Sequence, residues 1–147
     1  MFRNILIPTD GSELATLAVD AGIAFAKDVK ARITVFTVVE PFHLFSADAE
    51  QLGSTREEYE AISRQHAAET LAAAQAKAER SGVACDTDQV RTHEVYWAIV
   101  RKAQDIDADL IIMASHGRGG VGALIIGSVA AKVLTHTAIP VLIYRKK

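Results

Sequence analysis

Short apolar segments alternate with helical segments along this chain of 147 residues. Apolar runs of this length are typical of buried strands, and the segments between them carry helix formers at helical spacing. The expected strands span residues 5–8, 32–39, 83–90, 110–114 and 141–144, and the expected helices span residues 12–25, 55–81, 95–106 and 128–136. Strands that alternate with helices form a parallel sheet joined by right-handed crossovers. The sequence therefore predicts an α/β fold: one doubly wound, five-stranded parallel sheet with helices on both faces.

The residues at the expected helix ends support these boundaries. Residues 10–13 (D-G-S-E) match a capping box in which Asp10 caps the first helix and Glu13 reaches back to the Asp10 amide. Ser128 matches the N-cap of the last helix, and Gly82 matches the C-cap of the long second helix.

A glycine-rich loop connects the fourth expected strand to the last expected helix. Five of the eleven residues from 117 to 127 are glycines, at positions 117, 119, 120, 122 and 127. Glycine lets the backbone approach a ligand closely, and a helix N-terminus presents unpaired N–H groups and the positive end of its dipole. In a doubly wound sheet, ligands bind beyond the carboxyl ends of the strands, where this loop and Asp10 both lie. The loop therefore predicts phosphate binding.

Two well-known nucleotide motifs do not fit this loop. Gly117, Gly119 and Gly122 satisfy the dinucleotide pattern G-x-G-x-x-G, but that pattern follows a first strand and needs an acidic residue about 20 positions later. Residues 141–143, at that distance, are all apolar. The Walker A motif needs lysine and a hydroxyl residue after its last glycine, where residues 123–124 are Ala-Leu. We exclude both motifs.

Composition and charge exclude several classes of protein. Half of the residues are apolar, which suffices for one well-filled core, so we expect a single domain over residues 1–147. The net charge of −2, with both signs interspersed, provides no basic patch for nucleic acid. The chain shows neither a signal-peptide pattern nor an apolar run long enough for a membrane span, so we expect a cytoplasmic protein without a membrane partner. The single cysteine, Cys85, permits no disulfide within the chain.

The opening I-L-I-P-T-D-G-S at residues 5–12 and the distal S-H-G-R-G-G at residues 115–120 resemble the universal stress protein family. The likeness covers essentially the whole chain. It includes the family signature G-x2-G-x9-G-[ST], which falls on Ala114, Gly117, Gly127 and Ser128. Alanine at position 114 replaces the first glycine of the signature and adds a Cβ near the phosphates. The resemblance implies a Rossmann-like fold of the adenine-nucleotide alpha-hydrolase type, for which we expect the strand order 3-2-1-4-5.

The resemblance also implies a site for ATP, with Mg²⁺ arriving on the nucleotide. Asp10 would accept hydrogen bonds from the ribose hydroxyls, and Val38 would flank the adenine. The backbone N–H groups of residues 127–129 would hold phosphate oxygens, and Arg118 would add charge where it turns inward. The full set of expected binding residues is Pro8, Thr9, Asp10, Val38, Met113, Ala114, His116, Gly117, Arg118, Gly127, Ser128 and Val129.

The sequence contains no recognisable set of catalytic residues. Ser115 and His116 are neighbours, but a hydrolytic serine needs a base across space and an orienting carboxylate, and neither is identifiable. The aspartates at 105, 107 and 109 mimic a calcium loop, but Leu110 stands where that loop needs glycine. Fast phosphoryl transfer needs a positioned nucleophile and cations. We therefore expect no enzyme beyond slow ATP hydrolysis.

The last expected strand, residues 141–144, should lie at an edge of the sheet, where its unpaired backbone groups need covering. Pairing with the same strand of a second copy would form a homodimer, which the resemblance also implies. The resulting hypothesis is a cytoplasmic, homodimeric stress protein that signals by nucleotide occupancy. In the long connection over residues 41–54, Phe42, Leu44 and Phe45 either pack on the domain or form a lid over the nucleotide.

Two alternatives stay open. One is a nucleotide-free protein for dimerisation or partner binding, in which the glycine loop is structural, and Ala114 favours it. The other is an ATP-consuming enzyme for a small molecule, which would need a second pocket and an acid–base group. Asp10 likewise has two compatible roles, as a helix cap and as a ligand contact.

Overall fold

The structure is a computed structural model that describes residues 1–41, 55–117 and 125–146. The expectations for Phe42, Leu44, Phe45 and Arg118, and for the glycines at 119, 120 and 122, lie outside these residues. In the described part of the chain, no helix is long and apolar enough to cross a membrane.

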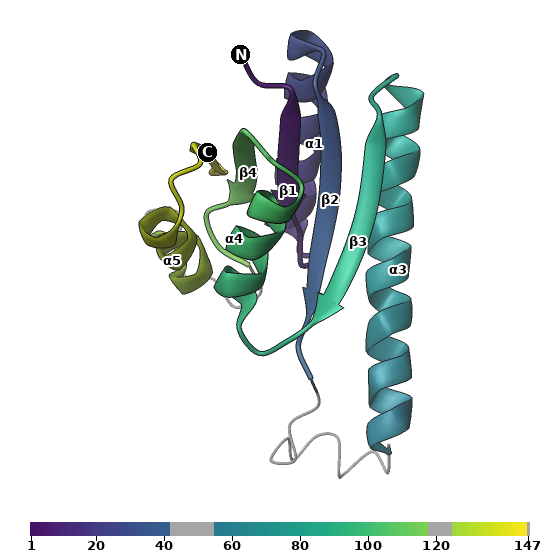
Figure 1. Ribbon diagram of the computed structural model, residues 1–147. Helices are drawn as coiled ribbons and strands as arrows, with labels where there is room; N and C mark the ends of the chain where they lie inside the picture. The colour runs from purple at the N-terminus through teal and green to yellow at the C-terminus, as the bar shows by residue number, and fades with distance from the viewer. Residues whose placement is uncertain (42–54, 118–124, 147) are drawn as a thin grey trace.

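Five parallel strands form one sheet in the order β3-β2-β1-β4-β5, which confirms the predicted topology (Figure 1). The strands are β1 (Asn4–Pro8), β2 (Arg32–Val39), β3 (Cys85–Arg91), β4 (Leu110–Ala114) and β5 (Val141–Tyr144). The helices are α1 (Glu13–Val29), α3 (Arg56–Arg80), α4 (Val95–Asp105) and α5 (Ser128–His136). The strand order reverses between β1 and β4, so the switch point of the sheet lies between these two strands.

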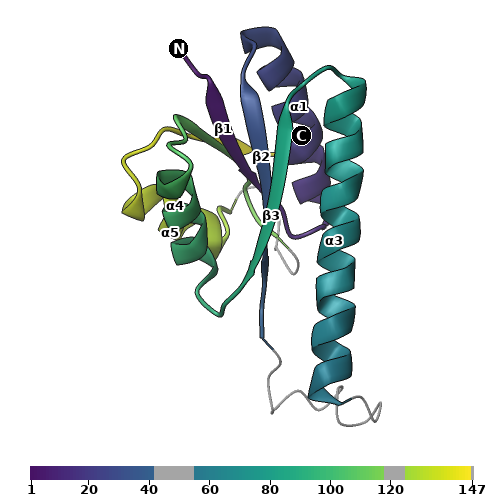
Figure 2. The same cartoon turned by 45° about the vertical axis from the view of Figure 1, so that its right-hand side comes forward.

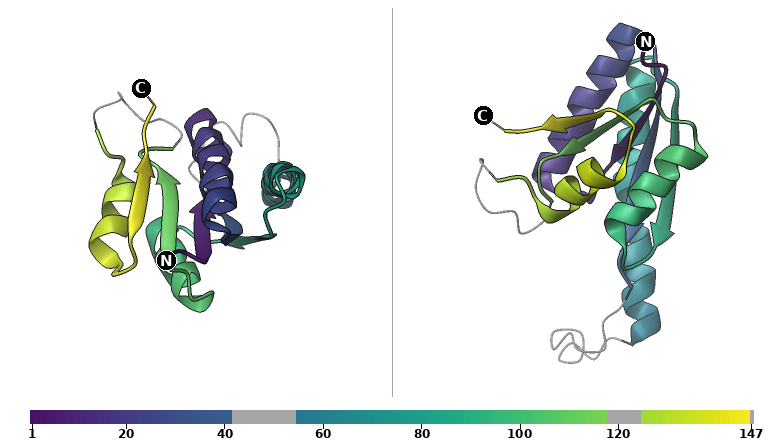
Figure 3. Two further views of the ribbon diagram at one scale, coloured as in Figure 1. Left: turned by 90° about the horizontal axis from the view of Figure 1, so that it is seen from above. Right: turned by 60° about the vertical axis from the view of Figure 1, so that its left-hand side comes forward.

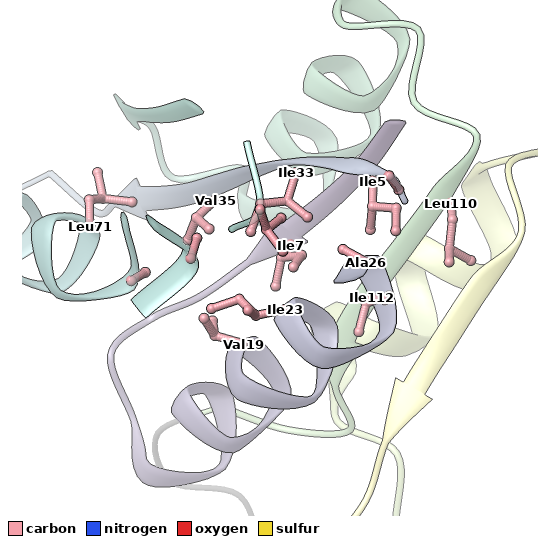
Figure 4. Packing of buried hydrophobic residues seen from close by; sticks show 14 residues of the cluster. Ile5, Ile7, Val19, Ile23, Ala26, Ile33, Val35, Leu71, Leu110 and Ile112 are labelled. Atoms are coloured by element: carbon pink, nitrogen blue, oxygen red, sulfur yellow. The ribbon is translucent and has the colours of Figure 1, made fainter. Parts of the chain in front are cut away.

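Helices cover both faces of the sheet, with α1 and α3 on one side and α4 and α5 on the other (Figure 3). Because side chains alternate along a strand, each strand feeds two separate clusters. Ile5 and Ile7 pack beneath α1 and α3 with Ile33 and Val35, as Figure 4 shows. Leu6 faces the other way and packs beneath α4 and α5.

Helix α3 is longer than the strands beside it. Its 25 residues rise about 1.5 Å each, whereas the seven residues of β3 rise about 3.3 Å each. The helix therefore continues beyond the carboxyl ends of the strands (Figures 1 and 2). The buried residues of α3 are confined to its second part and are Ala67, Leu71, Ala74 and Ala78.

Ion pairs fix α3 at both ends. Lys77 contacts Asp20 of α1 at 2.8 Å, and Arg91 at the end of β3 contacts Glu60 at 2.7 Å. A hydrogen bond from Arg56 and the charge of Arg91 lower the pKa of Glu60. The first part of α3, which precedes its buried residues, is thus held to the end of β3 by an ion pair.

The two edges of the sheet differ in chemistry. At the β3 edge, Asp86 pairs with Arg32 of β2, and Asp88 pairs with Lys102 of α4. At the other edge, β5 consists of the apolar residues 141–143 followed by a tyrosine, and the Leu142 side chain is 38% exposed. The expectation that the last strand lies at an edge is confirmed.

The start of α1 differs from the prediction. Ser12, and not Asp10, is the N-cap, and its Oγ accepts a hydrogen bond from the Ala15 amide at 3.3 Å. Gly11 has a φ of +78°, so the chain turns between the aspartate and the helix. Asp10 stabilises this turn, because its Oδ1 accepts a hydrogen bond from the Ser12 amide at 2.9 Å.

Several further boundaries shift, most of them by one or two residues, and α1 ends at Val29 instead of residue 25. Gly127 is the N-cap of α5, and Ser128 is the first helical residue. Ser81 is the C-cap of α3, and Gly82 follows it with a φ of +74°. The strand β3 begins at Cys85 instead of Val83, because the Val83 amide still donates to the Ala78 carbonyl of the helix end. Burial raises the pKa of the Cys85 thiol, which favours its interpretation as an unreactive packing residue.

Candidate functional site

A cavity of about 950 Å³ opens at the carboxyl ends of β1, β2 and β4, at the switch point of the sheet. Small-molecule sites typically have volumes of about 300–1,000 Å³, so this cavity is at the large end of the range. Of the expected binding residues, all except Arg118 lie in the described part of the chain. These eleven residues all line the cavity: Pro8, Thr9, Asp10, Val38, Met113, Ala114, His116, Gly117, Gly127, Ser128 and Val129.

One side of the cavity is apolar and lies toward α4 and α5. Val38 of β2 and Met113 of β4 pack there, with Val95 and Ile99 of α4 and Val129 of α5. These five side chains come from four elements, and none of them carries a charge. A planar, weakly polar group such as a nucleobase fits this surface, since apolar walls with few polar groups are typical of cofactor sites.

Asp10 lies at the centre of the cavity, where the turn after β1 meets the turn after β4. A Cβ built on Gly117 would be only 2.3 Å from Asp10 Oδ2, so the carboxylate lies directly against this glycine. The remaining Asp10 oxygen, Oδ1, accepts the Ser12 amide. Residues 107 positions apart are thereby in contact, and Asp10 has a structural role beside any contact with a ligand.

Replacing Gly117 by alanine is expected to displace the Asp10 carboxylate, because the new Cβ and Oδ2 cannot both keep their positions. For the ATP site that the resemblance implies, we expect this change to lower the affinity about tenfold, the effect of losing one good hydrogen bond to a charged group. The measurement is calorimetric titration with Mg-ATP. Gly22→Ala is the matched control, because its Cβ would crowd the tip of Ile7 at 2.6 Å, in the core. Equal affinities for Gly117→Ala and Gly22→Ala would contradict the prediction.

The opposite wall is the first turn of α5. The Gly127 amide donates to the Ser115 carbonyl at 2.7 Å, and a Cβ on Gly127 would lie 3.0 Å from that same oxygen. Glycine is therefore required for the close approach of this turn to the end of β4. The next amides, of residues 128–130, begin the helix and line the cavity, and amides of a first turn have no acceptor within their helix. This wall has the geometry of an anion site.

Ala114 has a different environment from the one expected. It is 8% exposed and packs with Leu14, Ala15 and Ala18 of α1. The residue borders the cavity, but its methyl group belongs to this small cluster beneath α1. The alternation of side chains along β4 explains this, because Met113 faces α4 and α5 and the following residue faces the other layer. The alanine is thus accommodated by helix packing.

Ser115 and His116 form a hydrogen-bonded pair, with 3.1 Å between Ser115 Oγ and His116 Nδ1. The imidazole beside the serine is that of the next residue, so this contact is not the base across space that a hydrolytic serine needs. The serine is only 2% exposed and so cannot meet a substrate, which favours a structural role for the pair. In the described parts of the chain, no group of three or more His, Cys, Asp or Glu side chains is arranged to hold a metal ion.

Helix α3 supplies a wall of the cavity that the sequence analysis did not include. The lining residues on it are Tyr59, Ile62, Ser63, His66, Ala67 and Thr70. The spacing of 59, 63, 66 and 70 places four hydrogen-bonding side chains on one face of a helix. This spacing was visible in the sequence, but the direction of that face depends on how the helix packs on β2 and β3.

The fold and this cavity define a doubly wound α/β protein with a cavity at its switch point. The chain belongs to the universal stress protein family, which it matches over residues 1–145. It is 32% identical to the universal stress protein MJ0531 of Methanocaldococcus jannaschii, over 99% of this chain and 84% of that protein. A crystal structure of a universal stress protein family member from Burkholderia pseudomallei is 31% identical, with a TM-score of 0.74 over 99% of this chain and 97% of that one.

Two other solved universal stress proteins share the fold and contain nucleotides. One is a complex with cAMP, with 22% identity and a TM-score of 0.67 over 97% of this chain and 96% of that one. The other, from Archaeoglobus fulgidus, is a complex with dAMP, with 19% identity and a TM-score of 0.64 over 99% and 98% of the two chains. Adenine nucleotides therefore bind to some proteins with this architecture.

Proposed function

We propose that this protein binds an adenine nucleotide, ATP with Mg²⁺, in the cavity at the switch point and acts in stress responses as a nucleotide-responsive homodimer in the cytoplasm. The observation that carries the proposal is the meeting of Asp10 with the turns at Gly117 and Gly127 around one cavity. An acceptor for ribose hydroxyls and donors for phosphate oxygens then lie on facing walls. The cAMP and dAMP complexes of related folds support the choice of base.

In this proposal each expected residue has a defined part. Val38 and Met113 contact the adenine, and Pro8 with Asp10 contacts the ribose. Thr9 fixes the turn instead, because its carbonyl accepts from the Thr37 hydroxyl at 2.8 Å and its Oγ1 accepts from the Gly11 amide at 3.2 Å.

The phosphates occupy the wall opposite Asp10. The amides of residues 128 and 129 donate to their oxygens, whereas the Gly127 amide, which the sequence analysis also assigned to the phosphates, donates to the Ser115 carbonyl. His116 and Gly117 border the same region. Mg²⁺ would neutralise phosphate charge and keep most of its water ligands. We propose no catalytic residue and at most slow hydrolysis.

The proposed dimer forms through β5. This edge strand presents apolar side chains, and Leu142 is 38% exposed, as is usual for an edge that is covered by a partner. Two copies would meet there by a two-fold, self-complementary contact. The nucleotide-free alternative was favoured by Ala114, and the packing of its methyl group beneath α1 weakens that argument.

The test is thermal unfolding with and without excess Mg-ATP. A ligand at about 100 times its Kd stabilises the native state by about 2.7 kcal/mol, which raises the Tm of a chain of this size by about 5–10 °C. We expect Asp10→Asn to abolish most of the rise, because it removes the charge but keeps Oδ1 as acceptor for the Ser12 amide.

The matched control is Asp109→Asn at the other end of the sheet. Asp109 also accepts backbone amides, from Arg3 at 2.8 Å and Asn4 at 3.1 Å, but it does not line the cavity. We expect its nucleotide-induced rise in Tm to equal that of the wild type. No rise for the wild type at millimolar Mg-ATP would overturn the proposal and leave the nucleotide-free alternative.

A further inference from the structure

We distinguish two compartments of this single cavity by the elements that line them. The base compartment lies on the α4 and α5 side, around Val38 and Met113. The second, here called the α3 compartment, is lined by Tyr59, Ile62, Ser63 and His66. The nucleotide of the proposed function accounts for the base compartment and for the centre at Asp10. It leaves the α3 compartment without an assigned ligand group.

The α3 compartment is continuous with the centre of the site. A Cβ on Gly11 would lie 3.1 Å from Thr70 Oγ1 and 3.6 Å from His66 Nε2, so α3 approaches the turn that carries Asp10. From this contact, the row formed by His66, Ser63 and Tyr59 runs toward the N-terminus of α3. A ligand at Asp10 therefore has a direct path along α3.

The chemistry of the α3 compartment changes along this path. Near the centre it offers an imidazole and hydroxyl groups, which suit a phosphate or a ribose. Farther out it offers the ring of Tyr59, 38% exposed, and the side chain of Ile62, 65% exposed. On the facing rim of the cavity, Ile125 is 65% exposed and Ile126 is 42% exposed. Gathered exposed apolar side chains of this kind mark ligand grooves and interaction sites.

We propose that the α3 compartment is a second subsite, which takes an aromatic group joined to the nucleotide through its phosphates. Since the base compartment holds the adenine, the added group must extend from the phosphate end of the nucleotide. A second nucleobase fits both features, because its ring packs on Tyr59 and Ile62, its ribose lies near Ser63 and His66, and the linking phosphates span from the first turn of α5 to α3. The ligand class is a dinucleoside polyphosphate. This inference rests on the proposed function.

The experiment is calorimetric titration of the full chain with Mg-ATP and, separately, with Mg²⁺ and diadenosine tetraphosphate. We expect the dinucleotide to bind about tenfold more tightly than ATP, which is the gain from stacking one base on an aromatic ring. We expect one dinucleotide per chain, since both compartments belong to the same cavity. Tyr59→Ala is expected to remove the tenfold advantage and to change the affinity for ATP by less than about twofold.

Trp97→Ala is the matched control. Trp97 is an aromatic residue of α4 that is 47% exposed and does not line the cavity, so its removal should alter neither affinity. Tyr59 precedes the buried part of α3, so the variant should fold, and Ile62→Ser tests the same surface without loss of a ring.

The unfavourable results separate the second subsite from the proposed function. Equal affinity of the wild type for the two ligands overturns the second subsite but leaves nucleotide binding intact. The same holds if Tyr59→Ala weakens both ligands equally, or if one dinucleotide binds per two chains. Failure of both ligands to bind overturns the proposed function and this inference together.

Discussion

Replacing Leu6 by alanine is expected to lower the free energy of unfolding by about 2–5 kcal/mol, out of a total of about 5–15 kcal/mol. Leu6 is fully buried on the central strand, paired with Thr34 of β2 and Ile111 of β4. Its side chain packs in the cluster beneath α4 and α5, where strands and helices leave little room to collapse around the missing atoms. Urea unfolding followed by circular dichroism measures the change.

Ile62→Ala is the control for this prediction. Ile62 has a side chain of equal size, but it is 65% exposed on the projecting part of α3, so its removal should change stability by less than about 0.5 kcal/mol. A loss below about 1 kcal/mol for Leu6→Ala would mean that the centre of the sheet is far less tightly packed than described here.

Gly127→Asp is expected to weaken nucleotide binding by at least about a hundredfold. The new Cβ would lie 3.0 Å from the Ser115 carbonyl oxygen and 3.1 Å from His116 Cα, so the first turn of α5 must shift away from the end of β4. The new carboxylate would also stand among the amides proposed for the phosphates, and placing like charges together costs several kcal/mol. Titration with Mg-ATP measures the loss.

Gly82→Asp separates this effect from a general loss of stability. Gly82 has a φ of +74°, which disfavours any other residue, but a Cβ there would meet no atom within 4 Å. That variant should therefore unfold at a lower temperature and still bind Mg-ATP with the wild-type affinity. If Gly127→Asp also retained wild-type affinity, the phosphates would have to be bound elsewhere.

The sequence predicted the fold well because the signals for a doubly wound sheet repeat along the chain. Four of the five strands are short apolar runs, whereas β3 is more polar, and several helices have recognisable residues at their ends. Boundaries were less certain where two capping residues lie close together, as Asp10 and Ser12 do. The φ of Gly11 decides between them, and it is a property of the folded turn.

The sequence placed the loop residues that line the cavity, but not the side chains of α3 that line it. Asp10 and the glycines follow strands whose carboxyl ends must meet, so topology alone brings them together. Side chains of α3 line the cavity because the helix is longer than β3 and extends beyond the end of that strand. One face of this extension is directed toward the cavity. Neither the rotation of that helix nor the orientation of the Ala114 methyl group follows from local sequence, because packing between layers sets both.

The unequal edges of the sheet limit how many copies can assemble. An edge strand that exposes apolar side chains favours pairing with another strand, whereas charged side chains along an edge disfavour such pairing. Two chains that joined through β5 would bury both apolar edge strands. Both β3 edges, with Asp86 and Asp88, would then face solvent. In the proposed dimer, growth would end at two copies, because the closed pair would present charge at each end of its ten-stranded sheet. The placement of four charged residues would then favour a dimer over a fibre.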